Sequence, residues 1–251
     1  MKQEDNILFS VNEGIGLLQL NRPQVLNALD RQMYLELEGK LAAAAADDQV
    51  RVVIFAGRGR AFCAGTDIGG LEGATVEAAQ ELALVENGAF NAIEDFPKPT
   101  LAALHGYALG GGCELALACD YRVVADDTFL GQPEIDMGWL PAAGATFRLP
   151  ALVGRARAWE MMATGRRIDA AEAERIGLVQ RVVAADALMA EVMELGRGLA
   201  QQDPQLLLRL KEVLKGGGER KEAVEREAQC LAQFATAAPA QQKIRAFLKR
   251  K

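Results

Sequence analysis

Short apolar segments alternate with longer segments of helical character, and this alternation constrains the fold more than any other feature of the chain. The apolar segments 50–56, 100–104 and 121–125 have the length and composition of buried strands. The intervening stretches 30–46 and 75–95 carry helix caps and a helical spacing of apolar residues. Strands separated by helices predict an α/β fold with crossover connections.

The two ends of the chain differ from this alternating middle. Residues 7–20 predict two strands joined by a short turn. After Pro150 the helical signals dominate, and Asp203-Pro204 is typical of a helix start. A chain of 251 residues can hold one large core with a smaller appendage. We therefore predict an α/β core at residues 1–195 and a helical region at residues 196–251.

Composition disfavours several classes of function. The net charge of −6, from 28 basic and 34 acidic residues, argues against a general affinity for nucleic acid. No segment approaches the roughly 18 apolar residues of a membrane span, and the polar start is neither a signal nor a transit peptide. The four cysteines show no paired or zinc-binding spacing. We predict a cytoplasmic protein with reduced thiols and with neither a nucleic-acid nor a membrane partner.

Catalytic side chains other than carboxylates are scarce. His105 is the only histidine and Ser10 the only serine, so a Ser-His-Asp triad would have to use both. Ser10 falls in a predicted strand, away from any nucleophile-elbow pattern. A metal site with two or three histidine ligands is impossible within one chain, and we expect no metal centre. The residues left for proton chemistry are mainly Asp and Glu.

Three segments combine glycine with carboxylates, at residues 61–68, 105–115 and 129–135. Glu114 lies within an apolar run and in the first turn of a predicted helix at residues 113–119, where a buried carboxylate needs partners. The glycine triplet before it can present backbone N–H groups to a ligand. This pattern suits oxyanion stabilisation beside a proton-transfer group. Each part also has an ordinary explanation, because such glycines are common in turns and such glutamates are usually solvated.

A family resemblance decides between these interpretations. The three segments, together with Asn21-Arg22-Pro23, Asn27-Ala28-Leu29 and Thr164-Gly165-Arg166, resemble in this order the signature of the crotonase (enoyl-CoA hydratase/isomerase) superfamily. The resemblance covers nearly the whole chain. It implies a core built as a spiral of ββα units and a C-terminal helical region that packs into homotrimers, often paired as hexamers.

The resemblance also implies a site. The backbone N–H groups of Thr66 and Gly111 would form an oxyanion hole, and Glu114 and Glu134 would be the catalytic pair. Asp67 has the simpler role of ordering its loop. No cofactor is implied, because CoA is part of the substrate. The residues implied in binding the acyl-CoA substrate are Thr66, Asp67, Ile68, Gly69 and Gly111.

The implied reaction is reversible syn addition of water to a trans-2-enoyl-CoA, giving a 3-hydroxyacyl-CoA. A Δ3,Δ2-enoyl-CoA isomerase that uses one glutamate is the nearest alternative. Ala142 and Ala145 stand where the family commonly has glycine, and Thr66 stands where alanine is common. These departures leave open a lyase or hydrolase acting on a specialised acyl-CoA. The acidic charge and the intact glutamate pair disfavour a scaffold or RNA-binding relative.

Overall fold

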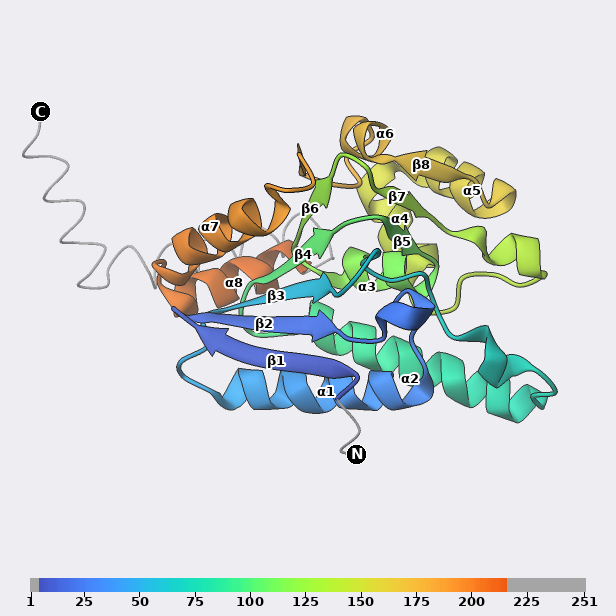
Figure 1. Cartoon of the computed structure of the whole chain (residues 1–251), viewed down its shortest axis with the longest axis horizontal. Coiled ribbons are helices and arrows are strands. Elements are labelled where there is room, and N and C mark those ends of the chain that lie inside the picture. Colours follow the sequence, from blue (N-terminus) through green and yellow to red (C-terminus); the bar gives the residue numbers. More distant parts are fainter. Residues whose placement is uncertain (1–4, 216–251) are drawn as a thin grey trace, which may run out of the picture. The chain divides into compact units, whose positions relative to one another are not determined.

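The computed structural model describes residues 5–215 (Figure 1). The chain divides into two compact units, residues 1–200 and 201–251. Of the second unit the structure describes residues 201–215, so most of the predicted C-terminal helical region lies outside the described residues. The predicted boundary at residue 195 falls inside a helix that packs on the main sheet.

Two sheets form the strand framework of the first unit. The larger has the order β1-β2-β3-β4-β6-β9, with β1 and β2 antiparallel and the other neighbours parallel. Its strands are β1 (Ile7–Asn12), β2 (Ile15–Leu20), β3 (Val52–Gly57), β4 (Thr100–Leu104), β6 (Tyr121–Ala125) and β9 (Arg181–Val183). The smaller sheet has the order β5-β7-β8. It consists of β5 (Tyr107–Leu109), β7 (Phe129–Gly131) and β8 (Arg167–Asp169).

The first two helices begin where the sequence places polar caps. Asp30 accepts a hydrogen bond from Met33 N at the start of the first helix, and Thr75 accepts one from Ala78 N at the start of the second. The helices are α1 (Arg31–Ala46), α2 (Val76–Glu94), α3 (Gly111–Ala118), α4 (Ala145–Val153), α5 (Arg155–Thr164), α6 (Ala170–Arg175), α7 (Leu188–Ala200) and α8 (Pro204–Lys215). Short 3-10 turns occupy Pro23–Val25, Ile68–Leu71 and Pro133–Met137.

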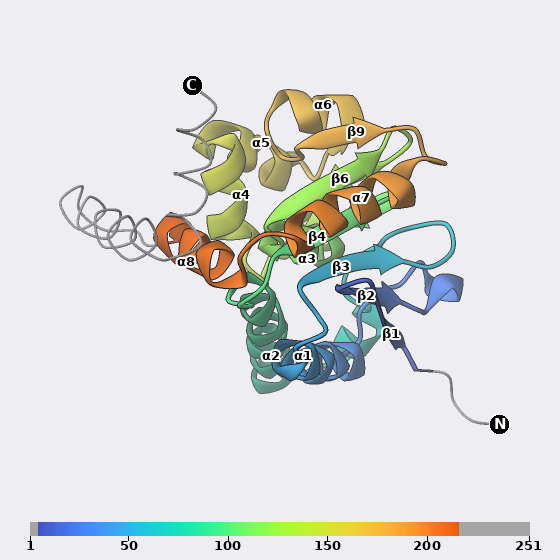
Figure 2. The same cartoon turned by 90° about the vertical axis from the view of Figure 1, so that its left-hand side faces the viewer.

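The larger sheet is covered on both faces, as expected for parallel strands. Alternate residues of β3 belong to different cores. Val53 and Phe55 pack with α1, α2 and α3, whereas Ile54 packs with Leu188 and Val192 of α7. Figure 2 shows α7 on one face of the sheet and α3 on the other. This period of two confirms that the apolar segments are buried strands.

The structure differs from the sequence expectation in two places. Helix α3 begins at Gly111, inside the glycine triplet, so the predicted start at residue 113 was two residues too late. The sequence predicts that the part after Pro150 is nearly all helix, and this is wrong, because two strands interrupt it. Strand β8 pairs with β7 in the smaller sheet, and β9 pairs with β6 in the larger sheet. Within residues 5–215, no helix has the length and apolar character that a membrane crossing requires.

Candidate active site

The loop that carries Thr66 is held by the Asn-Arg-Pro and Asn-Ala-Leu motifs. The fully buried Asn27 side chain donates to the carbonyl oxygens of Arg58, Ala61 and Phe62 at 2.8–3.1 Å. Leu29 bridges to Thr66, since Leu29 N donates to Gly65 O and Asp67 N donates to Leu29 O. Backbone groups alternate in direction along extended chain, so the N–H of Thr66 points away from Leu29.

The glycine triplet lies against this loop. A bridge between Cys63 and Ala108 sets the loop beside β5, which leads directly into the triplet. A Cβ added at Gly111 would lie 2.8 Å from Thr66 Oγ1 and 3.2 Å from Thr66 N, so only glycine allows this approach. Among the described residues, neither amide donates to a backbone carbonyl. The two residues are therefore neighbours, and neither of their N–H groups is used by a backbone acceptor among the described residues.

Glu114 lies in the first turn of α3 and is only 2% exposed. Its Oε1 accepts hydrogen bonds from Ala143 N at 2.9 Å and Ala145 N at 3.0 Å. Burial raises the pKa of Glu114 to about 7, although these two hydrogen bonds favour the charged form. Glu114 Oε1 is thus held by the segment in which Ala142 and Ala145 stand where the family commonly has glycine. Glu114 Oε2 remains for a bound molecule.

Glu134 lies in the 3-10 turn after β7. With its amide nitrogen turned toward Glu134, the buried Gln132 side chain donates to Oε1 at 3.0 Å and to Oε2 at 3.3 Å. Gly110, with φ +51°, lies against this carboxylate, because a Cβ added there would be 2.9 Å from Glu134 Oε1. Burial raises the pKa of Glu134 to about 7, and the charges of Glu114 and Glu86 add to the rise.

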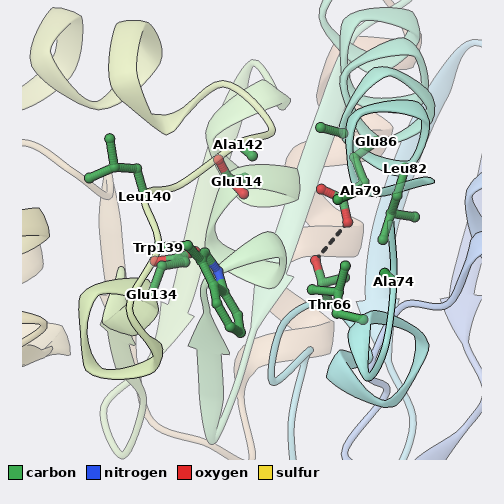
Figure 3. Close-up of a pocket in the computed structure, with 12 residues that line it drawn as sticks. Thr66, Ala74, Ala79, Leu82, Glu86, Glu114, Glu134, Trp139, Leu140 and Ala142 are labelled. Carbon is green, nitrogen blue, oxygen red and sulfur yellow. Dashed lines mark hydrogen bonds between the residues drawn. The ribbon is translucent and has the colours of Figure 1, made fainter. Parts of the chain in front are cut away.

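One cavity of about 400 Å³ brings these groups together. Thr66, Glu114 and Glu134 all line it, and Figure 3 shows the two glutamates on one side with Thr66 on the other. Most of the remaining wall is apolar. It includes Leu71, Ala79, Leu82, Trp139, Leu140 and Ala142.

Glu86 is a site residue that the sequence reasoning missed. It lies on α2, is 6% exposed and lines the same cavity. Its Oε1 accepts from Tyr34 Oη at 3.1 Å and from Thr66 Oγ1 at 3.0 Å. Burial raises the pKa of Glu86. Helical spacing could have identified it, because Glu86 stands four residues after Leu82 and four before Phe90 on the buried stripe of α2.

Asp67 and Gly69 line a second cavity of about 510 Å³, which shares Thr66, Leu71 and Leu82 with the first. Asp67 accepts from Gly69 N at 3.2 Å and pairs with Arg22 at 3.1 Å, so it orders this loop. Ile68 is 49% exposed and lines neither cavity. Three of the five implied substrate residues, Thr66, Asp67 and Gly69, thus line one or both of two adjoining cavities. Gly111 lines neither cavity but abuts Thr66.

His105 lies outside both cavities, where its Nε2 is 3.1 Å from Gly59 O. Cys63, Cys113 and Cys119 are buried cysteines that form no disulfide with one another, and burial raises the pKa of Cys63 to about 12. Cys230 lies outside the described residues. Among residues 5–215, no group of three His, Cys, Asp or Glu side chains is arranged to hold a metal ion.

Comparison with known proteins identifies the family to which a chain with this site belongs. The sequence matches the Enoyl-CoA hydratase/isomerase family over residues 10–251. The chain belongs to this family. A probable enoyl-CoA hydratase of Rhizobium meliloti (strain 1021) is 42% identical over 189 residues, which cover 75% of this chain and 73% of the relative. The crotonyl-CoA hydratase of Syntrophomonas wolfei is 39% identical over 216 residues, which cover 85% and 82%.

Solved members of the enoyl-CoA hydratase/isomerase family share the architecture. The crystal structure of an enoyl-CoA hydratase from Bacillus anthracis matches with a TM-score of 0.92 and 32% identity, covering 98% of this chain and 97% of that chain. These likenesses confirm the predicted family and the predicted crotonase-type α/β fold.

Proposed function

We propose that the chain is an enoyl-CoA hydratase that adds water reversibly across the double bond of a trans-2-enoyl-CoA. The observation that carries the proposal is the presence of two carboxylates, the buried Glu114 and the half-buried Glu134, each with its pKa raised to about 7, in the cavity that also holds Thr66. An acid and a base are both required for hydration. An isomerase needs one carboxylate, so the pair favours the hydratase.

The N–H groups of Thr66 and Gly111 bind the thioester carbonyl oxygen. Their closeness supports this role, since a Cβ at Gly111 would lie 3.2 Å from Thr66 N. Charge grows on this oxygen as water adds to C3, and preorganised donors stabilise that charge without reorganisation. Thr66, Asp67 and Gly69 extend the site into the second cavity, and we assign the thioester and its CoA to the junction of the two cavities, beside Ile68.

The two carboxylates divide the proton transfers. Because the pKa of each carboxyl group is raised to about 7, the protonated and the charged forms of both are accessible near neutral pH. Glu114, whose charged form accepts hydrogen bonds from Ala143 and Ala145, deprotonates the water that attacks C3. Glu134 also holds that water and delivers the proton to C2. No metal or redox group takes part in this scheme, and CoA belongs to the substrate.

The proposal extends to assembly as a homotrimer or hexamer. Among the described residues, Phe147, Leu152 and Trp159 of α4 and α5 are exposed, with Trp159 68% accessible. Large apolar side chains gathered on neighbouring helices are typical of subunit contacts. Light scattering at micromolar concentration tests this assembly, and a monomer would contradict it.

The test of the activity is hydration of trans-2-butenoyl-CoA in D₂O. We expect the absorbance of the conjugated enone to fall and the product to be 3-hydroxybutyryl-CoA with one deuterium at C2, placed syn to the hydroxyl. A rise in enone absorbance with trans-3-hexenoyl-CoA, and no hydration of any trans-2-enoyl-CoA of four to eight carbons, would instead identify an isomerase.

A further inference from the structure

Three oxygen atoms lie within hydrogen-bonding distance of one another at one wall of the catalytic cavity, and the two hydroxyls among them donate to the one carboxylate. Tyr34 Oη and Thr66 Oγ1 are 3.0 Å apart, and both reach Glu86 Oε1, at 3.1 and 3.0 Å. Tyr34 is fully buried beneath this wall and packs edge-on against Phe90 at a centroid distance of 5.8 Å. The Glu86 carboxylate is therefore held in one orientation rather than free to rotate.

The held carboxylate faces the cavity. Both of its described hydrogen bonds end on Oε1, and among the described residues Oε2 has no partner. Figure 3 shows Glu86 directed across the cavity toward the side that carries Glu114 and Glu134. Oε2 is thus a polar atom presented to whatever occupies the cavity.

The surroundings of Glu86 restrict that occupant. No Lys or Arg of the described chain lines the cavity, and α2 contributes the apolar Ala79, Leu82 and Ala83 beside Glu86. A carboxylate-bearing acyl chain would meet three acidic side chains and no cation, which is unfavourable. A purely aliphatic chain would strip water from Glu86 Oε2 and return no hydrogen bond, which also costs free energy.

A hydroxyl group satisfies Glu86 in either protonation state, because it donates to a carboxylate and accepts from a carboxylic acid. The position of that hydroxyl follows from Thr66. Its N–H is assigned to the thioester oxygen, while its Oγ1 touches Glu86 at 3.0 Å. Glu86 therefore lies near the thioester end of the acyl chain, within reach of the first carbons beyond C3.

We propose that Glu86, oriented by Tyr34 and Thr66, is a specificity-determining residue that selects 2-enoyl-CoA thioesters with a hydroxyl group on C4 or C5. The inference rests on the proposed hydratase function and names its substrate class.

The experiment compares isosteric pairs in which hydroxyl replaces methyl. The pairs are trans-4-hydroxy-2-butenoyl-CoA with trans-2-pentenoyl-CoA, and trans-5-hydroxy-2-pentenoyl-CoA with trans-2-hexenoyl-CoA. In at least one pair the unmodified protein should favour the hydroxylated member by about tenfold to a hundredfold in kcat/KM, the worth of a buried hydrogen bond to an ionisable group. Glu86→Leu should abolish or reverse this preference, whereas Glu86→Gln, which keeps a polar amide at the site, should retain its sign.

Three controls make the result decisive. Hydration of trans-2-hexenoyl-CoA by Glu86→Leu shows that the variant is folded. Glu77→Gln, at a fully exposed position of α2, should leave kcat/KM unchanged for both members of each pair. Binding of the corresponding amides, in which NH replaces the thioester sulfur, is measured by calorimetry and does not depend on turnover. If no thioester is hydrated but the hydroxylated amides still bind more tightly than their methyl counterparts, the proposed hydratase function fails and the hydroxyl-binding role of Glu86 stands. Equal kcat/KM and equal amide binding within both pairs, or an equal loss on both members in Glu86→Leu, would overturn the subsite.

Discussion

Replacing Gly111 with alanine should remove most of the turnover while leaving the chain folded. Gly111 is the first residue of α3 and lacks the positive φ of Gly110, so its backbone suits alanine. The added Cβ would meet Thr66 Oγ1 at 2.8 Å and Thr66 N at 3.2 Å. Thr66 cannot easily yield, because Tyr34 and Glu86 hold its hydroxyl. We therefore expect the two amides of the proposed oxyanion hole to move apart.

Loss of one oxyanion donor typically lowers turnover by about 10² to 10³, or roughly 3 to 4 kcal/mol. We expect this loss in kcat with trans-2-butenoyl-CoA, and a smaller change in KM, because charge on the thioester oxygen develops only toward the transition state. Thr66→Ala alone keeps its N–H and should lose little activity. Combined with Gly111→Ala it removes the 2.8 Å contact and should restore part of the turnover.

Gly39→Ala is the matched control. Gly39 lies within α1 with no atom within 4 Å of the added Cβ, so the substitution should raise stability by about 0.5 to 1 kcal/mol and leave kcat unchanged. Full turnover in Gly111→Ala, or a double variant no better than Gly111→Ala, would refute the argument that the Gly111–Thr66 contact sets the oxyanion hole.

Three further predictions concern Glu114, His105 and Asn27. The fold raises the pKa of Glu114 from 4.5 to about 7. The contribution of Glu114 to stability is therefore fully present below pH 4.5 and is lost as pH rises through about 7. The free energy of unfolding, measured in urea, should decline over this pH window, and the decline should be shallower in Glu114→Gln. His105→Asn should leave the pH–rate profile of hydration nearly unchanged, because His105 contacts Gly59 O outside both cavities; loss of one limb of the profile would contradict this. Asn27→Ala leaves three carbonyl oxygens without their donor and should lower the free energy of unfolding by about 2 to 4 kcal/mol in urea titrations, whereas a change below about 0.5 kcal/mol would show that water replaces the amide.

The long elements of the fold could be predicted from sequence because each has its own local signal. The caps Asp30 and Thr75 mark the starts of α1 and α2, and the apolar runs mark β3, β4 and β6. The strands β5, β7, β8 and β9 have three residues each, too few to show an alternating pattern. They form because neighbouring segments offer hydrogen-bond partners, which is information that no local window contains.

The site residues likewise fall into those with a local sequence signal and those without one. Glu114 and Glu134 were found because they stand in glycine-rich segments that resemble a known family. Glu86 stands in an ordinary amphipathic helix, and only the packing of α2 against α1 and α3 turns it into a cavity wall. Tyr34 has the same character, since it reads as one more buried residue of α1 beside Leu37.

The central claim is that Glu114 and Glu134 act together on one water molecule, and the turnover of the two isosteric amide variants tests it most directly. With trans-2-butenoyl-CoA, Glu114→Gln and Glu134→Gln should each lower kcat by about 10² to 10⁴, the usual worth of general acid or base catalysis. KM should change much less, because neither variant alters the oxyanion hole or the second cavity. Hydration at an undiminished rate by either variant would contradict the shared-water mechanism.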